Sequence, residues 1–194
     1  PTHQPIEHAN MLRMTPNIDV WRPADQLETT VAWTHALASH NRPSALLLSR
    51  QTLPPSSNAP HLDDLMRGAA IVHEPSVPPE AIIIATGSEV SLAIEAAQHC
   101  QQYAIRVVSM PCCELFLRQS QDFQARILPP LITKRMSIEA GSTAYWHQFV
   151  GTHGITKGID TFGVSAPAAD AYRACGLDCE HIVAGLETLL TQPE

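Results

Sequence analysis

Ala81-Ile82-Ile83-Ile84-Ala85-Thr86-Gly87-Ser88-Glu89 is the stretch that decides the fold of this chain. An unbroken apolar run without alternation is typical of a strand that is buried on both faces of a parallel sheet. Gly87 breaks the strand, and Ser88 is expected to cap a helix from Val90 to about Gln101 with a small-residue face. The stretch therefore predicts one strand–helix unit of an α/β fold.

The same alternation of strands and helices continues on both sides of this unit. Further strands are expected at residues 69–72, 105–110, 135–139 and 159–161, and further helices near 123–128, 144–150, 168–174 and 181–190. Short breaks separate them. The pattern predicts an α/β domain, with a mostly parallel sheet and helices on both of its faces.

The first fifty residues contain a separate crossover unit. An extended run at residues 18–21 precedes Pro23, which is expected to open a helix that reaches about His40. Residues 45–48 are then expected to form a second, buried parallel strand. Strand, helix and strand make a crossover unit. Its helix is expected to turn Leu27, Val31 and Leu37 inward.

Residues 52–60 are rich in proline and serine, a composition typical of an interdomain linker. We therefore expect a partial α/β domain at residues 1–52, a linker at 53–67 and a second domain at 68–194.

Composition limits the partners and the compartment. The chain has 194 residues, a formal net charge of -7 and no run of lysine or arginine, so nucleic acid and anionic membranes are excluded as expected partners. No apolar stretch approaches the roughly 20 residues of a membrane span. The polar start differs from a signal peptide, so a cytoplasmic location is expected. The five cysteines match no zinc or disulfide spacing, and reduced, unligated thiols are favoured.

Two residues stand where they could contact a ligand. Arg50 directly follows the apolar run 45–48, and ligands bind at the carboxyl ends of parallel strands. A guanidinium there suits a phosphate, although an ion pair at a domain interface is an equal alternative. His3 lies in a proline-flanked turn, and Pro5 suits the first turn of a following helix. A turn histidine bonded only to backbone is the alternative for His3.

Other candidate sites are weaker. The helix start at residues 87–89 could bind an anion, but a tight turn with a Ser88 cap is favoured. No pair of histidines stands at metal-ligand spacing on a helix, and no metal site is expected.

Six runs together resemble the transketolase family, in its order and spacing and across essentially the whole chain. They are Pro1-Thr2-His3-Gln4-Pro5-Ile6-Glu7, Ser49-Arg50-Gln51, residues 84–90, residues 107–111, Glu139-Ala140-Gly141 and residues 161–168. The first run is the most specific, because it resembles the stretch that separates transketolases from other thiamine-diphosphate enzymes. The later runs are shared more loosely with dihydroxyacetone synthase and deoxyxylulose-phosphate synthase.

The resemblance implies a function for the parts that are present. Residues 1–52 are similar to the end of a pyrimidine-binding domain, and residues 68–194 to a transketolase C-terminal domain that serves dimer contact and stability. His3 is similar to the family histidine that lies over the thiazolium and contacts the donor's C1 hydroxyl, as both a catalytic and a substrate-binding residue. Arg50 is similar to the arginine that grips the sugar's terminal phosphate. The implied activity is ketol transfer between sugar phosphates in the pentose phosphate pathway, by a cytoplasmic dimer.

The cofactor motifs of the family do not occur in this sequence. A Gly-Asp-Gly run followed later by Asn-Asn is absent, and so are the acidic and aromatic residues that hold the pyrimidine ring. The resemblance therefore implies thiamine diphosphate and Mg²⁺ or Ca²⁺ in the complete enzyme, with neither cofactor nor metal bound to this chain alone.

We accordingly expect the isolated chain to be inactive. Its partner would be a transketolase N-terminal half or a second subunit, whether the chain is a fragment or one subunit of a split enzyme. Two alternatives remain open. One is a non-catalytic C-terminal module for interaction or dimerisation, and the other is a fragment of a related thiamine-diphosphate enzyme such as dihydroxyacetone synthase.

Overall fold

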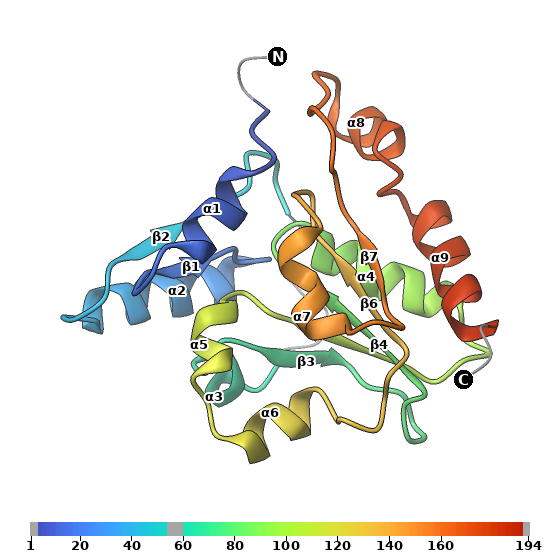
Figure 1. The fold of residues 1–194 in the computed structure, drawn as a ribbon, viewed down its shortest axis with the longest axis horizontal. Coiled ribbons are helices and arrows are strands. Elements are labelled where there is room, and N and C mark those ends of the chain that lie inside the picture. Colours follow the sequence, from blue (N-terminus) through green and yellow to red (C-terminus); the bar gives the residue numbers. More distant parts are fainter. Residues whose placement is uncertain (1–3, 54–59, 192–194) are drawn as a thin grey trace.

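Two sheets organise this computed structural model, which describes residues 4–53 and 60–191. A two-stranded sheet belongs to the N-terminal part of the chain, and a five-stranded sheet belongs to the part after residue 60. Figure 1 shows the blue N-terminal part lying beside the larger sheet.

The five-stranded sheet is centred on β4 (Ala81–Ala85), the strand predicted from the unbroken apolar run. Its order is β3-β5-β4-β6-β7, with β3 at Ala70–His73, β5 at Ile105–Ser109, β6 at Arg135–Ile138 and β7 at Ile155–Lys157. β4 pairs in parallel with β5 and β6, and β6 pairs in parallel with β7. Only the edge strand β3 runs antiparallel to its neighbour. The mostly parallel sheet is therefore confirmed.

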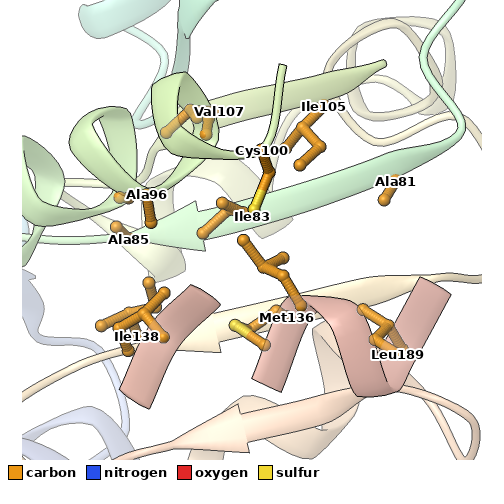
Figure 2. Packing of buried hydrophobic residues seen from close by; sticks show 14 of the residues in the cluster. Ala81, Ile83, Ala85, Ala96, Cys100, Ile105, Val107, Met136, Ile138 and Leu189 are labelled. Atoms are coloured by element: carbon orange, nitrogen blue, oxygen red, sulfur yellow. The ribbon is translucent and has the colours of Figure 1, made fainter. Parts of the chain in front are cut away.

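Helices cover both faces of this sheet, as the sequence predicts. On one face, Ile83 packs in a buried cluster beneath α4 (Glu89–His99) and α9 (Cys179–Thr191). Figure 2 shows Ala96 of α4, Cys100 directly after α4 and Leu189 of α9 in this cluster. On the other face, Ile82 and Ile84 pack beneath α5 (Cys113–Leu117), α6 (Gln121–Ile127) and α7 (His147–Val150). Fully burying one such isoleucine stabilises the fold by about 1.5–3 kcal/mol.

Some predicted elements differ from the structure. The strand predicted at residues 159–161 is wrong, because pairing with β6 selects residues 155–157. Gly158 follows that strand, where a Cβ would lie 2.6 Å from the Gly141 carbonyl oxygen, so the glycine serves close backbone approach. The helix α5 was not predicted, because five residues are too few to show helical periodicity. Residues 144–150, which were predicted to form one helix, form a 3₁₀ turn at Ala144–Trp146 followed by α7.

The N-terminal part forms the predicted crossover unit. It contains α1 (His8–Met14), β1 (Asp19–Trp21), α2 (Gln26–Ala38) and β2 (Ser44–Leu46), with β1 and β2 parallel. Two details were wrong. Leu37 is 75% exposed rather than inward-facing. β2 is only half-buried, because few described residues cover it.

The junction of the two parts has a hydrophobic core of its own. Trp21 and Val31 pack there against Leu65 of α3 (Leu62–Leu65) and Leu115 of α5. Because α3 lies inside the predicted linker 53–67, four residues in the later half of that linker form a packed helix. The domain boundaries at residues 52 and 68 stay a prediction. None of the described helices combines the length and the apolar character needed to cross a bilayer.

Candidate functional site

A buried group of charged side chains joins the N-terminal part to the five-stranded sheet. Glu139 stands directly after β6, and both of its oxygens accept hydrogen bonds from Arg13 Nη1 and Nη2, at 2.7 and 2.8 Å. Arg22 Nη1 donates to Glu139 Oε1 at 2.7 Å, and Trp146 Nε1 donates to Oε2 at 2.6 Å. Burial alone would raise the pKa of Glu139, but Arg13 and Arg22 outweigh it and lower that pKa to about 2. Glu139 is therefore ionised at neutral pH.

A second carboxylate completes this charged junction. Glu89, the first residue of α4, is buried, and its Oε2 lies 3.1 Å from Arg22 Nη1. Its Oε1 accepts hydrogen bonds from Ser88 Oγ and from the hydroxyl of Tyr172, a residue of α8 (Ala168–Ala174). Burial and the neighbouring Glu89 raise the pKa of Tyr172, which stays protonated. Two arginines and two glutamates thus balance one another, and the group carries no net charge.

The helix start at residues 87–89 is consequently not an open anion site. Gly87 has a φ of 60°, which confirms a tight turn. Ser88 does not cap α4, because its hydroxyl donates to Glu89 at 2.7 Å instead. Arg22 covers the turn, since a Cβ on Gly87 would lie 3.2 Å from the Arg22 guanidinium carbon.

A cleft of about 440 Å³ opens over this junction, between the N-terminal part and the C-terminal domain. The N-terminal part contributes residues from the segments 4–9 and 47–51 together with Arg22. The C-terminal domain contributes Ser88, Gly163 and Tyr172, among others. The cleft is therefore built from both sheets, and neither part alone forms it.

The predicted site residues relate to this cleft in different ways. His3 lies outside the described residues, but Gln4, Pro5 and Ile6, which follow it in the most specific run, line the cleft. Ser49 and Gln51 also line it. Arg50 between them is exposed and is not among the described lining residues. The structure thus brings together the two segments that carry His3 and Arg50, while the roles of these two side chains stay predictions.

Gly163 holds a third segment against the most specific run. A Cβ at this position would lie 2.6 Å from Gln4 Cβ and 2.9 Å from the Gln4 carbonyl oxygen, which is too close for any side chain. The loop after β7 therefore contacts the backbone next to His3 only because residue 163 is glycine.

Sequence reasoning missed the charged junction. No function was predicted for Arg13 or Arg22. Glu139 appeared only in one of the six runs that resemble transketolase. Arg13 and Glu139 are separated by 126 positions, so no local spacing reveals the pair. The one available signal was a glutamate directly after a strand rich in buried residues, since such a carboxylate needs a cation.

The described residues do not fit a diphosphate–metal group. No aspartate or glutamate is among the described residues that line the cleft, and both carboxylates behind it are paired with arginine. Mg²⁺ and Ca²⁺ need oxygen ligands that are free to coordinate. No step of the chemistry is therefore assigned to such a group on this chain.

The adjacent free cysteines Cys112 and Cys113 are buried beneath the junction. Cys112 precedes α5 and Cys113 is its first residue. Burial raises the pKa of Cys113 to about 12, although nearby Arg13 acts to lower it. A thiol of that pKa is a poor nucleophile at neutral pH.

Two family profiles match this sequence. The profile of the transketolase-like TK C-terminal domain matches residues 68–178, and the profile of the transketolase pyrimidine binding domain matches residues 1–56. Together they account for most of the chain.

Individual proteins agree with the profiles. A plasmid-encoded transketolase of Cupriavidus necator is 47% identical over an alignment of 194 positions, which covers 98% of this chain and 28% of that protein. The transketolase structure from Leishmania mexicana has a TM-score of 0.91 and 38% identity, and it covers 100% of this chain and 28% of its own. A split-gene transketolase chain, described as an inactive β4 tetramer, has a TM-score of 0.77 at 21% identity and shows a common fold only. This chain spans less than a third of the length of the curated relatives that it matches.

Proposed function

This chain belongs to the transketolase family, and from that premise we propose that it is the C-terminal part of a ketol-transferring enzyme. The complete enzyme moves a two-carbon ketol unit from a ketose phosphate to an aldose phosphate. The reaction belongs to sugar-phosphate metabolism of the pentose phosphate type, and the enzyme is a cytoplasmic dimer.

The cleft carries this proposal. It places Gln4, which follows His3, and both neighbours of Arg50 around one opening of about 440 Å³. A sugar phosphate needs a group for its reacting end and a cation for its phosphate. The two segments that can supply them meet at this cleft, although they are separated by more than forty residues in the sequence.

His3 is proposed to act at the reacting end of the sugar. Its imidazole would hold and move a proton at the donor's C1 hydroxyl, which suits a side chain whose ordinary pKa lies near neutrality. The close packing of Gly163 on Gln4 fixes the backbone beside it.

Arg50 is proposed to bind the terminal phosphate. It is exposed, and within residues 4–53 and 60–191 it forms no ion pair with a carboxylate, so its charge is available. The planar guanidinium matches two phosphate oxygens at once. This contact supplies orientation rather than chemistry.

Thiamine diphosphate, held by Mg²⁺ or Ca²⁺, supplies the carbanion-stabilising chemistry when it is bound in the complete enzyme. Its binding groups belong to parts of the family's enzyme that this sequence does not contain. We therefore propose that the isolated chain binds no cofactor and has no turnover. Calorimetric titration of the chain with thiamine diphosphate and magnesium should give no saturable heat, and a stoichiometric isotherm would contradict this.

A chimera tests the function directly. The matched 28% of the Cupriavidus necator enzyme would be replaced by this chain, and ketol transfer from a ketose phosphate would be measured. We expect activity in the chimera, loss of kcat on His3→Ala and no change on His153→Ala, an exposed histidine outside the cleft. A folded chimera without activity, or one that His3→Ala leaves unchanged, would contradict the assignment.

Arg50→Ala in the same chimera separates phosphate binding from chemistry. Loss of a charged hydrogen-bonded contact of about 1.5–3 kcal/mol corresponds to a KM increase of roughly 10- to 150-fold for a phosphorylated ketose. An unphosphorylated ketose should be nearly unaffected. Arg173→Ala, an exposed arginine on α8, is the matched control. An equal rise in KM for both donors would contradict the assignment of Arg50 to the phosphate site.

One observation favours the alternative of a non-catalytic interaction module. Trp33 and Leu37 on α2 are 51% and 75% exposed, and Met14 on α1 is 78% exposed, so this part presents apolar surface to a partner. A chimera that folds and dimerises without catalysis would support the module. Catalysis with a different donor preference would support a related thiamine-diphosphate enzyme.

A further inference from the structure

Three metal-ligating side chains meet on the surface between α4 and α9, far along the chain from the cleft residues 4–9. Glu95 and His99 stand one helical turn apart on α4, and Cys179 is the first residue of α9. One ligand atom from each lies within 4.8 Å of the other two. Glu95 and His99 are exposed and Cys179 is half-buried, so an ion can reach all three.

The distance between the two softer ligands fits a tetrahedral ion. Zn–S and Zn–N bonds of about 2.3 and 2.0–2.1 Å at a tetrahedral angle place sulfur and nitrogen about 3.6 Å apart. Cys179 Sγ and His99 Nδ1 are 3.6 Å apart. Both helices pack on the same buried cluster, so this spacing is set by the core beneath them.

The charge around the cluster is unbalanced. Glu95 brings a carboxylate against the imidazole of His99 and the thiol of Cys179. In the described part of the chain, no lysine or arginine forms an ion pair with Glu95. The adjacent Asp178 is already bonded to His181 at 2.6 Å. The cluster is thus rich in electron pairs and lacks a cation.

We propose that Glu95, His99 and Cys179 form a zinc site that ties the start of α9 to α4. Thiolate and imidazole ligands favour Zn²⁺ over Mg²⁺ and Ca²⁺, which prefer oxygen. Zn²⁺ displaces the thiol proton to solvent and gains a thiolate. His99 Nδ1, now 2.9 Å from the Glu95 carbonyl oxygen, gives up that contact and its proton moves to Nε2. Water fills the fourth position.

Cobalt provides a probe that reports thiolate ligation specifically. Tag-free chain, first stripped with a chelator, would be titrated with Co²⁺ and followed by its absorption spectrum. We expect one equivalent to produce a thiolate-to-cobalt charge-transfer band together with visible bands of tetrahedral cobalt, and Zn²⁺ to abolish both. Absence of the charge-transfer band in the unmodified chain would overturn the site.

Matched variants separate this site from casual binding by the other histidines and thiols. Cys179→Ser should remove the charge-transfer band, and Glu95→Gln should weaken binding by at least about 10-fold, since even outer-shell changes cost 10- to 100-fold. Cys175→Ser and His181→Gln alter a cysteine and a histidine close by in sequence, and both variants should keep the charge-transfer band. A band that survives Cys179→Ser, or that is lost equally in Cys175→Ser, would contradict the assignment.

Thermal unfolding gives a second readout that needs no activity. Zn²⁺ should raise the unfolding temperature of the unmodified chain and of Cys175→Ser, but not that of Cys179→Ser, because only a site in the folded state stabilises it. Without metal, Cys179→Ser and the unmodified chain should unfold at similar temperatures. Equal stabilisation of all three proteins by Zn²⁺ would overturn the site, whatever the chimera shows about ketol transfer.

Discussion

The central strands of the five-stranded sheet and the strand β2 of the two-stranded sheet differ in how completely they are covered. Every residue of β4 and β5 is buried, because helices pack on both faces of that sheet. All three residues of β2 are only half-buried, and Trp33 and Leu37 of the neighbouring α2 are exposed. The larger sheet therefore has a core of its own, whereas the N-terminal part depends on its junction with that sheet.

The junction holds the two parts together by two different kinds of buried carboxylate. Glu139 is ionised between Arg13 and Arg22. Glu28 of α2 faces no cation among its hydrogen-bond partners: Ser109 Oγ donates to it at 2.6 Å and the Ala24 amide at 2.7 Å. Burial raises the pKa of Glu28 to about 7, despite these hydrogen bonds. The junction thus has one strongly charged contact and one that is neutral in mildly acidic solution.

Glu139→Gln should cause the largest loss in the free energy of unfolding. It leaves Arg13, whose side chain is fully buried, without a carboxylate partner, and breaking a buried ion pair in this way costs about 3–5 kcal/mol. The free energy of unfolding would be measured by urea titration. Glu187→Gln, at an exposed position of α9, is the control and should stay within about 0.5 kcal/mol. A loss below about 1 kcal/mol for Glu139→Gln would mean that the charged junction does not hold the parts together.

A pair of truncations compares the two parts directly. Ile83→Ala should cost about 2–5 kcal/mol, because it opens a cavity in the covered sheet. Leu37→Ala should cost less than about 0.5 kcal/mol in the isolated chain, since the side chain is already solvated. Urea midpoints of the two variants measure the difference. Similar losses at both sites would show that α2 is covered in solution.

The pH dependence of stability should have opposite signs for the two carboxylates. The folded-state pKa of Glu28 lies above its ordinary value of 4.5. The contribution of Glu28 to the free energy of unfolding is therefore fully present below about pH 4.5 and is lost as the pH rises through about 7. Glu139 has a lowered pKa, so its contribution is present above pH 4.5 and is lost as the pH falls towards 2.

Glu28→Gln should therefore flatten the fall in unfolding free energy between about pH 4.5 and 7, a change of about 1–3 kcal/mol. Stability curves at a series of pH values measure it. A variant that follows the same pH profile as the unmodified chain would exclude Glu28 as the titrating group.

Gly163→Ala should have a small effect on stability and a larger one on the cleft. The added methyl group forces Gln4 to move, at an overpacking cost of about 1 kcal/mol. In the active chimera this substitution should lower kcat clearly, while the unfolding midpoint should change little. Gly151→Ala is a control for steric crowding, because nothing lies within 4 Å of a Cβ there, although its φ of 73° adds strain. A normal kcat for the Gly163→Ala chimera would mean that the loop after β7 does not affect catalysis at the cleft.

Elements with a strong local pattern could be predicted from sequence, and elements set by distant pairing could not. The unbroken apolar run of β4 was sufficient for that strand, whereas α2 begins at Gln26 with Asp25 as its cap, three residues after the predicted Pro23. β7 was misplaced because Ile155–Lys157 has one apolar residue, and its position follows from pairing with β6. The inward direction of Leu37 was wrong because α2 turns Val31 and Ala32, not Leu37, toward the junction core.

The site shows the same limit. Position in the sequence singled out His3 and Arg50, but their roles came only from the resemblance to a family, because a lone histidine or arginine has no distinguishing pattern. The Arg13–Glu139 pair and the Glu95, His99 and Cys179 cluster bring together residues from distant elements, so only the three-dimensional structure reveals them.

Native-state hydrogen exchange, followed amide by amide on the isolated chain, tests the dependence of the N-terminal part on its junction most directly. Amides of β4 and β5 should exchange only through global unfolding, whereas those of β1, β2 and α2 should exchange through a lower-energy opening. Glu139→Gln should speed exchange in the second group more than in the first. Equal protection of both sheets, changed equally by Glu139→Gln, would contradict the view that only the larger sheet has a self-sufficient core.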